Sequence, residues 1–212
     1  MKVNLQPHPT YTCTCHNVLG AWKEFLQNDE PAAVLDLTGF ACFEEYLQKA
    51  VNATARNRYN YSYKNGYTSR LLTWEERNLY LKDIFEINTS APIRQGKPMK
   101  ENYSRFPLGF TTNTNECAEH YTRFIGCFYQ GKCVAYISAH FCGKLAAASQ
   151  ILGHAEYLKN GIMLSVWMEF VAQCFAKGVE KIVYSRWKDG TNGLKYWKHS
   201  VGMKSEVLKE QI

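Results

Sequence analysis

The 212-residue sequence has no apolar run long enough to cross a membrane. A membrane-spanning helix needs about 20 consecutive apolar residues. The first residues, Met1 to Pro7, also lack the apolar core of a secretion signal. We therefore expect a cytoplasmic protein with no membrane partner, whose eight cysteines stay as thiols in a reducing compartment.

Motifs for two common kinds of chemistry are missing as well. No Gly-x-Ser-x-Gly elbow occurs, so a Ser-His-Asp hydrolase is not supported. The segment Cys13-Thr14-Cys15-His16 contains metal-ligand side chains, but Cys-x-Cys is tighter than the usual zinc spacing and no closing Cys or His pair follows. We expect no bound metal.

The composition is that of a folded globular chain. Hydrophobic residues make up 46% and aromatic residues 14%. The length fits one domain, which we place at residues 34–212 after an extension of residues 1–33. The net charge of +6 suits an anionic ligand such as a nucleotide cofactor or a nucleic acid, and it is equally compatible with ordinary solvated lysines.

Secondary-structure signals are mixed in the first half of the chain. Thr73 and Glu76 form a capping-box pattern at the start of one predicted helix. Residues 88–118 are loop-like. The expected elements are a strand at 34–37, a helix at 40–55, a basic aromatic stretch at 56–66, a strand at 67–72 and a helix at 74–87.

The last ninety residues give a clearer pattern. Leu164, Trp167, Met168 and Val171 share one face of a predicted helix at 161–177. Three strands precede this helix at 121–129, 133–141 and 144–152; a strand at 181–184, a helix at 193–200 and a strand at 203–208 follow it. This order predicts an α/β (α+β) fold: one mixed, mostly antiparallel sheet with helices on both faces.

The element order has a consequence for ligand binding. The strand at 181–184 must return parallel to the strand at 144–152, and a cleft opens at the helix N-terminus if the two splay apart. Free amides and the positive end of the helix dipole favour a phosphate there. The residues of this turn are Lys159, Asn160, Gly161 and Ile162.

Three segments in this order resemble known transferases. A basic segment, Arg56–Gly66, precedes the strand at Tyr67; Ile93-Arg94-Gln95-Gly96 follows the next helix; and Trp197–Met203 comes late in the chain. Residues 121–208 resemble the core of the GNAT superfamily of N-acyltransferases. Residues 50–208 resemble more closely the FemABX-like aminoacyl transferases within it.

The resemblance implies a single GNAT-like domain that performs acyl transfer with acetyl-CoA or another acyl-CoA, or with aminoacyl-tRNA as the alternative donor. The Gln/Arg-x-x-Gly-x-Gly/Ala loop that binds pyrophosphate in acetyl-CoA-dependent members is absent. Lys198 matches a lysine of FemABX-like enzymes and would stabilise the oxyanion or hold donor phosphate. Tyr196 is the nearby candidate acid, and Asn192 lies at the start of the same predicted helix as a candidate donor contact.

The remaining candidates come from position in the sequence. His154 and Glu156 precede the phosphate turn and could act as a general base. Arg94 could orient an acidic group of donor or acceptor.

Cations and stacking rings alternate after Arg56, and with Arg58 and Tyr61 they suit a nucleic-acid surface, for a tRNA donor or a DNA acceptor. An exposed strand-turn segment explains the same residues. A non-catalytic binding module on a GNAT-like scaffold is the hypothesis from another functional class.

Overall fold

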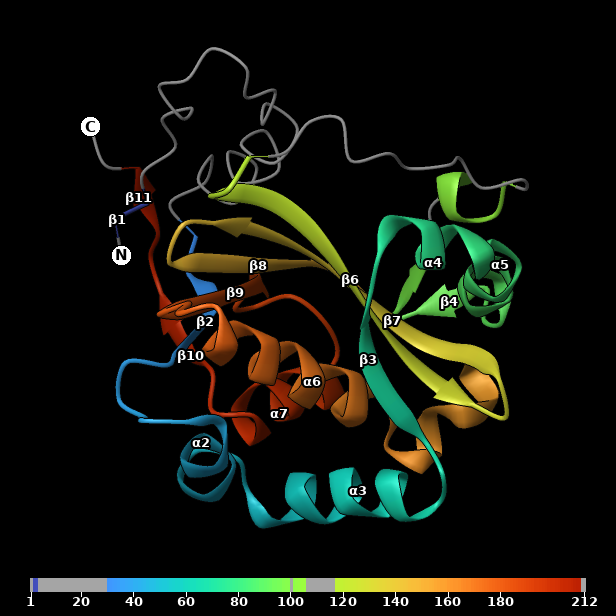
Figure 1. Ribbon diagram of the computed structural model, residues 1–212, viewed down its shortest axis with the longest axis horizontal. Helices are drawn as coiled ribbons and strands as arrows, with labels where there is room; N and C mark the ends of the chain where they lie inside the picture. The colour runs from blue at the N-terminus through green and yellow to red at the C-terminus, as the bar shows by residue number, and fades with distance from the viewer. Residues whose placement is uncertain (1, 4–29, 100, 106–116, 211–212) are drawn as a thin grey trace.

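We describe residues 2–3, 30–99, 101–105 and 117–210 of a computed structural model (Figure 1). Residues 4–29, which include the Cys13–His16 segment, lie outside the described part. Within that part, one seven-stranded sheet forms the centre of the molecule. Its strands, in spatial order, are β10 (Lys204–Glu206), β2 (Ala32–Asp36), β9 (Lys181–Arg186), β8 (Leu145–Gly153), β7 (Lys132–Cys142), β6 (His120–Tyr129) and β3 (Thr68–Leu72).

All neighbours in this sheet are antiparallel except β8 and β9, which are parallel. The expected mixed sheet is therefore confirmed. The sequence did not predict that β2 would pair between β9 and β10. Two short pairs stand apart from the sheet: β1 (Lys2–Val3) with β11 (Lys209–Glu210), and β4 (Ile93–Arg94) with β5 (Lys97–Pro98).

Helices cover both faces of the sheet. Side chains of successive strand residues point to opposite faces, so Ile137 joins the large core under α6 while its neighbour Tyr136 joins a smaller core under α5. The helices are α2 (Phe43–Lys49), α3 (Ala53–Lys64), α6 (Ile162–Ala176) and α7 (Asn192–Ser200) around the large core, and α4 (Trp74–Leu79) and α5 (Leu81–Thr89) on the other side; two 3₁₀ turns are η1 (Glu101–Tyr103) and η2 (Ala155–Asn160).

Helix α6 crosses the sheet and anchors the core (Figure 1). Trp167 and Phe170 are completely buried, and burying side chains of this size contributes about 1.5–3 kcal/mol each. Gly161 starts the helix with φ of 78°, and Gly178 follows its end with φ of 67°. Both positions are left-handed, a conformation that glycine adopts without strain.

Two predictions for the first half were wrong. The helix expected at 40–55 is two helices, and the stretch expected as a strand-turn segment is α3. The Asn52 side chain accepts a hydrogen bond from the Ala55 amide (2.8 Å) and so begins α3. The Arg56 guanidinium donates to carbonyls of Leu47, Gln48 and Val51, which terminates α2.

The Thr73–Glu76 capping box is confirmed, but the helix that it begins breaks at Tyr80 into α4 and α5. The expected loop at 88–118 contains the β4–β5 hairpin. Gln95 and Gly96 have φ of 53° and 77° in its two-residue turn, the backbone that such hairpins need.

In the described part of the chain, no helix combines the length and the apolarity needed to traverse a bilayer.

Candidate functional site

Strands β8 and β9 pair over only part of their length. The parallel register covers three residue pairs, from Leu145 with Lys181 to Ala147 with Val183. Beyond them β8 continues to Gly153 and β9 to Arg186 without pairing to each other. The predicted parting of these strands is confirmed, and it opens toward the start of α6.

A β-bulge in β8 explains where the parting begins. On the β7 side, Ser138 pairs with Gln150 and Ala139 with Ala148, so Ser149 is an extra residue. The Ser149 hydroxyl donates to the Ser138 carbonyl (2.9 Å). A bulge bends its strand and increases the local twist. It therefore turns β8 away from β9 just after their last paired residues.

The backbone of β9 is also unusual at this point. Ser185 has φ of 44°, a left-handed conformation that disfavours a serine within a strand. Such strain persists where the surrounding structure enforces it, and it concentrates at functional sites.

Two pockets lie along the parted strands. The α7-side pocket has a volume of about 370 Å³ and is bounded by α3, the start of α6 and the start of α7. The hairpin-side pocket has a volume of about 520 Å³ and is bounded by the β4–β5 hairpin and the end of β8. Both are lined by Gln95, Ile151, Leu158, Met163 and Tyr184, so the pockets adjoin across the parting.

Two helix N-termini and an arginine make the α7-side pocket electropositive. Gly161 begins α6 and Thr191 begins α7, and both residues line the pocket. Neither helix has an acidic residue in its first turn or a side-chain cap at its N-terminus. The exposed Arg58 of α3 adds a full positive charge. Two helix dipoles and a guanidinium thus favour an anion in one place.

Only part of the predicted phosphate turn faces this pocket. The position where Gly161 would carry a Cβ lies against the Arg58 carbonyl, so this glycine is required by the packing of α3 on α6. Ile162 is completely buried. The side-chain amide of Asn160 donates to the Tyr67 hydroxyl (2.7 Å). The exposed Lys159 is not among the residues that line either pocket.

Lys198 is a buried structural cation. The residue is 0% exposed, and its ammonium donates to the carbonyls of Arg186 (2.6 Å), Trp187 (3.2 Å) and Asp189 (3.0 Å). An ammonium has three hydrogens, so these carbonyls use its donor capacity. Burial lowers the pKa of Lys198. The side chain holds the segment leaving β9 and does not point into the gap between the strands.

Arg94 has the equivalent role at the end of β8. Its guanidinium donates to the carbonyls of Gly153 (2.8 Å) and Ile87 (2.5 Å) and to the Ser90 hydroxyl (2.8 Å). Arg94 also lines the hairpin-side pocket. Its contacts therefore fix the hairpin to the parted end of β8.

The other predicted catalytic residues, His154, Glu156 and Tyr196, are not among the residues that line the two pockets. The His154 ring packs on Tyr157 with ring centroids 5.3 Å apart, and its buried Nδ1 has no hydrogen-bond partner among the described residues. Glu156 is exposed. Tyr196 is 56% exposed, near Asn52 on the outer side of α7.

Of the residues predicted in the basic aromatic stretch, one lines a pocket and the others do not. Arg56 is engaged by the end of α2, whereas Arg58 lines the α7-side pocket. Tyr61 is 51% exposed on α3. Asn192 is exposed at the first position of α7, directly before the pocket residue Gly193.

Sequence reasoning missed the residues where the two pockets meet. Burial raises the pKa of the Tyr184 hydroxyl, and a hydrogen bond with the Gln95 side chain opposes this shift. Ser149, Met163 and Ser185 were likewise not predicted. The hairpin signal of Gln95-Gly96 was visible, but which strand end it would cover depends on tertiary packing.

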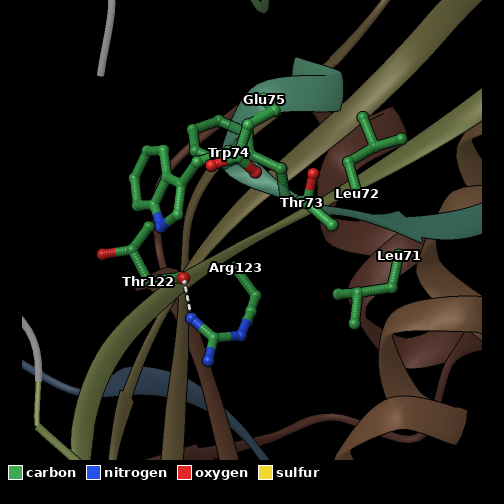
Figure 2. A pocket seen from close by; sticks show the side chains of 8 residues that line it. Leu71, Leu72, Thr73, Trp74, Glu75, Thr122 and Arg123 are labelled. Atoms are coloured by element: carbon green, nitrogen blue, oxygen red, sulfur yellow. Dashed lines mark hydrogen bonds between the residues drawn. The ribbon is translucent and has the colours of Figure 1, made fainter. Parts of the chain in front are cut away.

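A third pocket lies away from this region, between the end of β3 and β6. Its volume is about 290 Å³. Figure 2 shows Trp74, Thr73 and Leu72 on one side of it, with the Arg123 guanidinium donating to the Thr122 carbonyl (2.7 Å) on the other. None of the predicted site residues lines it.

Comparison with known proteins supports the fold assignment. No protein-family model matches the sequence, and no curated protein sequence matches it. Solved structures do match. FemX superposes with a TM-score of 0.61 at 8% identity, covering 84% of this chain and 59% of FemX. The C-terminal domain of a protein assigned as a lysylphosphatidylglycerol synthetase in Agrobacterium fabrum gives 0.52 at 14% identity, covering 82% and 51%.

A tandem GNAT protein from the clavulanic acid biosynthesis pathway gives a TM-score of 0.50 at 16% identity, covering 89% of this chain and 55% of that protein. The fold is therefore GNAT-like and is the fold that FemX also contains, as the sequence predicted. The chain spans between half and three fifths of the length of these three structures.

Proposed function

We propose that the protein is an acyltransferase that moves an acyl group from a donor of the acyl-CoA type to an amine or hydroxyl of an acceptor. The observation that carries the proposal is the pair of uncapped helix N-termini, of α6 and α7, that meet Arg58 at one end of the parted strands. This end would hold the donor phosphates. The acyl group would then reach the acceptor through the opening between Ile151 and Tyr184.

The bulge at Ser149 supports the chemical step. Beyond Ala147 the β8 amides on the β9 side pair with no strand among the described residues. Such fixed donors stabilise an oxyanion that develops on the donor carbonyl. In the reaction the acceptor nitrogen or oxygen bonds to the carbonyl carbon, the carbon–sulfur bond breaks, and the leaving thiolate takes up the proton that the acceptor loses.

The two pockets contain no carboxylate that could act as a general base. Among the described residues that line them, none is Asp or Glu. Catalysis in the proposed reaction would depend on positioning the two substrates and on stabilising the oxyanion. Lys198 would contribute by holding the end of β9, as a positioning residue.

Gly193 offers a direct test of donor binding. It is the second residue of α7 and lines the α7-side pocket, and a Cβ there has no contact closer than 3.7 Å. Gly193→Glu puts a negative charge at the proposed phosphate site. The same change stabilises α7 in the absence of ligand, because it removes a helix glycine and complements the dipole, together about 1 kcal/mol. Gly193→Gln is the matched neutral control.

We expect millimolar acetyl-CoA or CoA to raise the melting temperature of the wild-type protein and of Gly193→Gln, and not that of Gly193→Glu. The unliganded Gly193→Glu variant should melt no lower than the wild type. No shift with either ligand in the wild type would contradict an acyl-CoA donor.

Aminoacyl-tRNA is the second candidate donor, supported by the exposed face of α3. Tyr61 and Tyr63 are 51% and 70% exposed beside Arg58 and Lys64, and such rings and cations suit single-stranded nucleic acid. Filter binding of charged tRNA, with Tyr63→Ala as the variant, tests this alternative. If the protein binds neither CoA nor charged tRNA, the remaining hypothesis is a non-catalytic binding module.

A further inference from the structure

The charged residues of the hairpin-side pocket are all of one sign. Arg94 and Lys97 line it, and no described residue of its lining is acidic. A cationic acceptor such as a polyamine or a lysine side chain would meet two like charges and no carboxylate. Like charges in a partly enclosed site repel each other.

The two cations are also direct cross-strand partners. Arg94 of β4 is opposite Lys97 of β5, next to the two-residue turn. Like charges in opposite positions of a hairpin destabilise it. Arg94 donates to the carbonyls of Gly153 and Ile87, so Lys97 is the member of the pair whose charge is not used in holding the strand end.

Lys97 has no partner in the described part of the chain. Its side chain is exposed and makes no hydrogen bond or ion pair there, in contrast to the lysines at positions 49, 144 and 188, each of which pairs with a glutamate. Its ammonium remains available at the edge of the pocket.

Most of the remaining lining is apolar. Ile93, Pro98 and Met99 come from the hairpin, and Ile151, Leu152 and Met163 face them from β8 and α6. An apolar wall beside an unpaired cation fits a ligand with an apolar body and one acidic group. The pocket volume of about 520 Å³ is in the range of small-molecule sites.

We infer that the acceptor bound in the hairpin-side pocket is a small molecule that combines an apolar body with a negatively charged group, and that Lys97 binds the negative charge. This inference rests on the proposed function in one respect, that the bound molecule is the acceptor of acyl transfer. The binding property itself is independent of the donor and can be measured without one.

The test uses two fluorescent probes with the same rings. 8-Anilinonaphthalene-1-sulfonate carries a sulfonate, and N-phenyl-1-naphthylamine lacks it. We expect the sulfonate probe to bind the wild-type protein at least tenfold more tightly. Lys97→Glu should weaken its binding about tenfold or more, Lys97→Gln by less, and neither variant should change binding of the neutral probe. Lys204→Glu on β10 gives the same change in net charge away from the pocket, and it should leave both affinities unchanged.

Displacement of the sulfonate probe distinguishes the two sources of negative charge. Phenylacetate, phenyl phosphate and phenethylamine share a ring and differ in the polar group. Displacement by phenylacetate identifies a carboxylate site, displacement by phenyl phosphate identifies a phosphate site, and displacement by phenethylamine alone overturns the inference.

Equal affinities of the two probes, or equal loss in Lys97→Glu and Lys204→Glu, would also overturn it. Failure of the proposed function gives a different result. In that case acetyl-CoA produces no thermal shift, while the sulfonate probe still binds in a Lys97-dependent manner.

Discussion

The paired end and the parted end of β8 and β9 satisfy their backbones in different ways. From residues 145 to 147, β8 carbonyls and amides meet those of β9 in a regular parallel ladder. At the parted end side-chain cations take the place of the ladder. The buried Lys198 donates to the carbonyl of Arg186 at the end of β9 and to two carbonyls after it, and the partly buried Arg94 donates to the last carbonyl of β8. A sheet can open within a packed domain when side chains supply the missing donors. Those side chains then hold the ends of the two strands.

Removing the cation after β9 should have the largest effect on stability. Lys198→Met keeps the apolar stem but removes a charged donor from three carbonyls, of which that of Arg186 keeps a further donor, the Asp189 amide; we expect a cost of about 3 kcal/mol. Urea denaturation measures the loss. Lys195→Met, on the exposed side of the same helix, is the control and should change stability by less than about 0.5 kcal/mol. Similar losses of stability in the two variants would contradict a specific role of Lys198 in holding the end of β9.

The cation at the end of β8 should follow. Arg94→Met leaves the Gly153 carbonyl without its donor and removes one of the two donors of the Ile87 carbonyl, which keeps the Ser90 hydroxyl; we expect it to cost about 2 kcal/mol. Lys97→Met, its partner across the hairpin, should be nearly neutral because that ammonium holds no backbone group. If the two variants lose the same stability, Arg94 does not act through the strand end.

Acid should destabilise the protein at the paired end of β8 and β9. Burial lowers the pKa of His140 to about 4, and this residue is opposite Ala147 where the β8–β9 ladder ends. The unfolded chain therefore binds a proton between pH 6.5 and 4 that the folded chain excludes. Stability should fall as pH falls through that window, by on the order of 1 kcal/mol or more, and His140→Gln should flatten the profile. An unchanged slope in the variant would assign the acid sensitivity to other groups.

The smallest expected effect concerns backbone strain. Ser185→Gly removes a left-handed serine, and we expect a gain of about 0.5 kcal/mol after the added chain entropy is subtracted. Ser205→Gly in the extended strand β10 should instead lose about 0.5–1 kcal/mol. Opposite signs in thermal unfolding would confirm the strain at Ser185; a loss in both would contradict it.

The sequence predicted those parts of the molecule that depend on local signals. The β6–β7 and β7–β8 hairpins, the capping box at Thr73 and the glycines at both ends of α6 all follow from neighbouring residues. The parting of β8 and β9 followed from element order.

Long-range features were not predictable in this way. The basic aromatic stretch forms a helix because Asn52 caps it, and its tyrosines and asparagines gave no helical period. The contacts of Lys198 were not predicted, because the carbonyls that it binds come from the end of β9 and the segment after it. The bulge at Ser149 depends on β7, with which it shares no local motif.

Gly161 connects the packing of α3 on α6 with the position of the Arg58 charge. Its hydrogen atom occupies a place where any larger group would press on the carbonyl of Arg58. The guanidinium of that same arginine lines the α7-side pocket. Adding a single methyl group at position 161 would push α3 outward and move the Arg58 guanidinium with it. The distance between α3 and α6 therefore determines where this positive charge lies in the pocket.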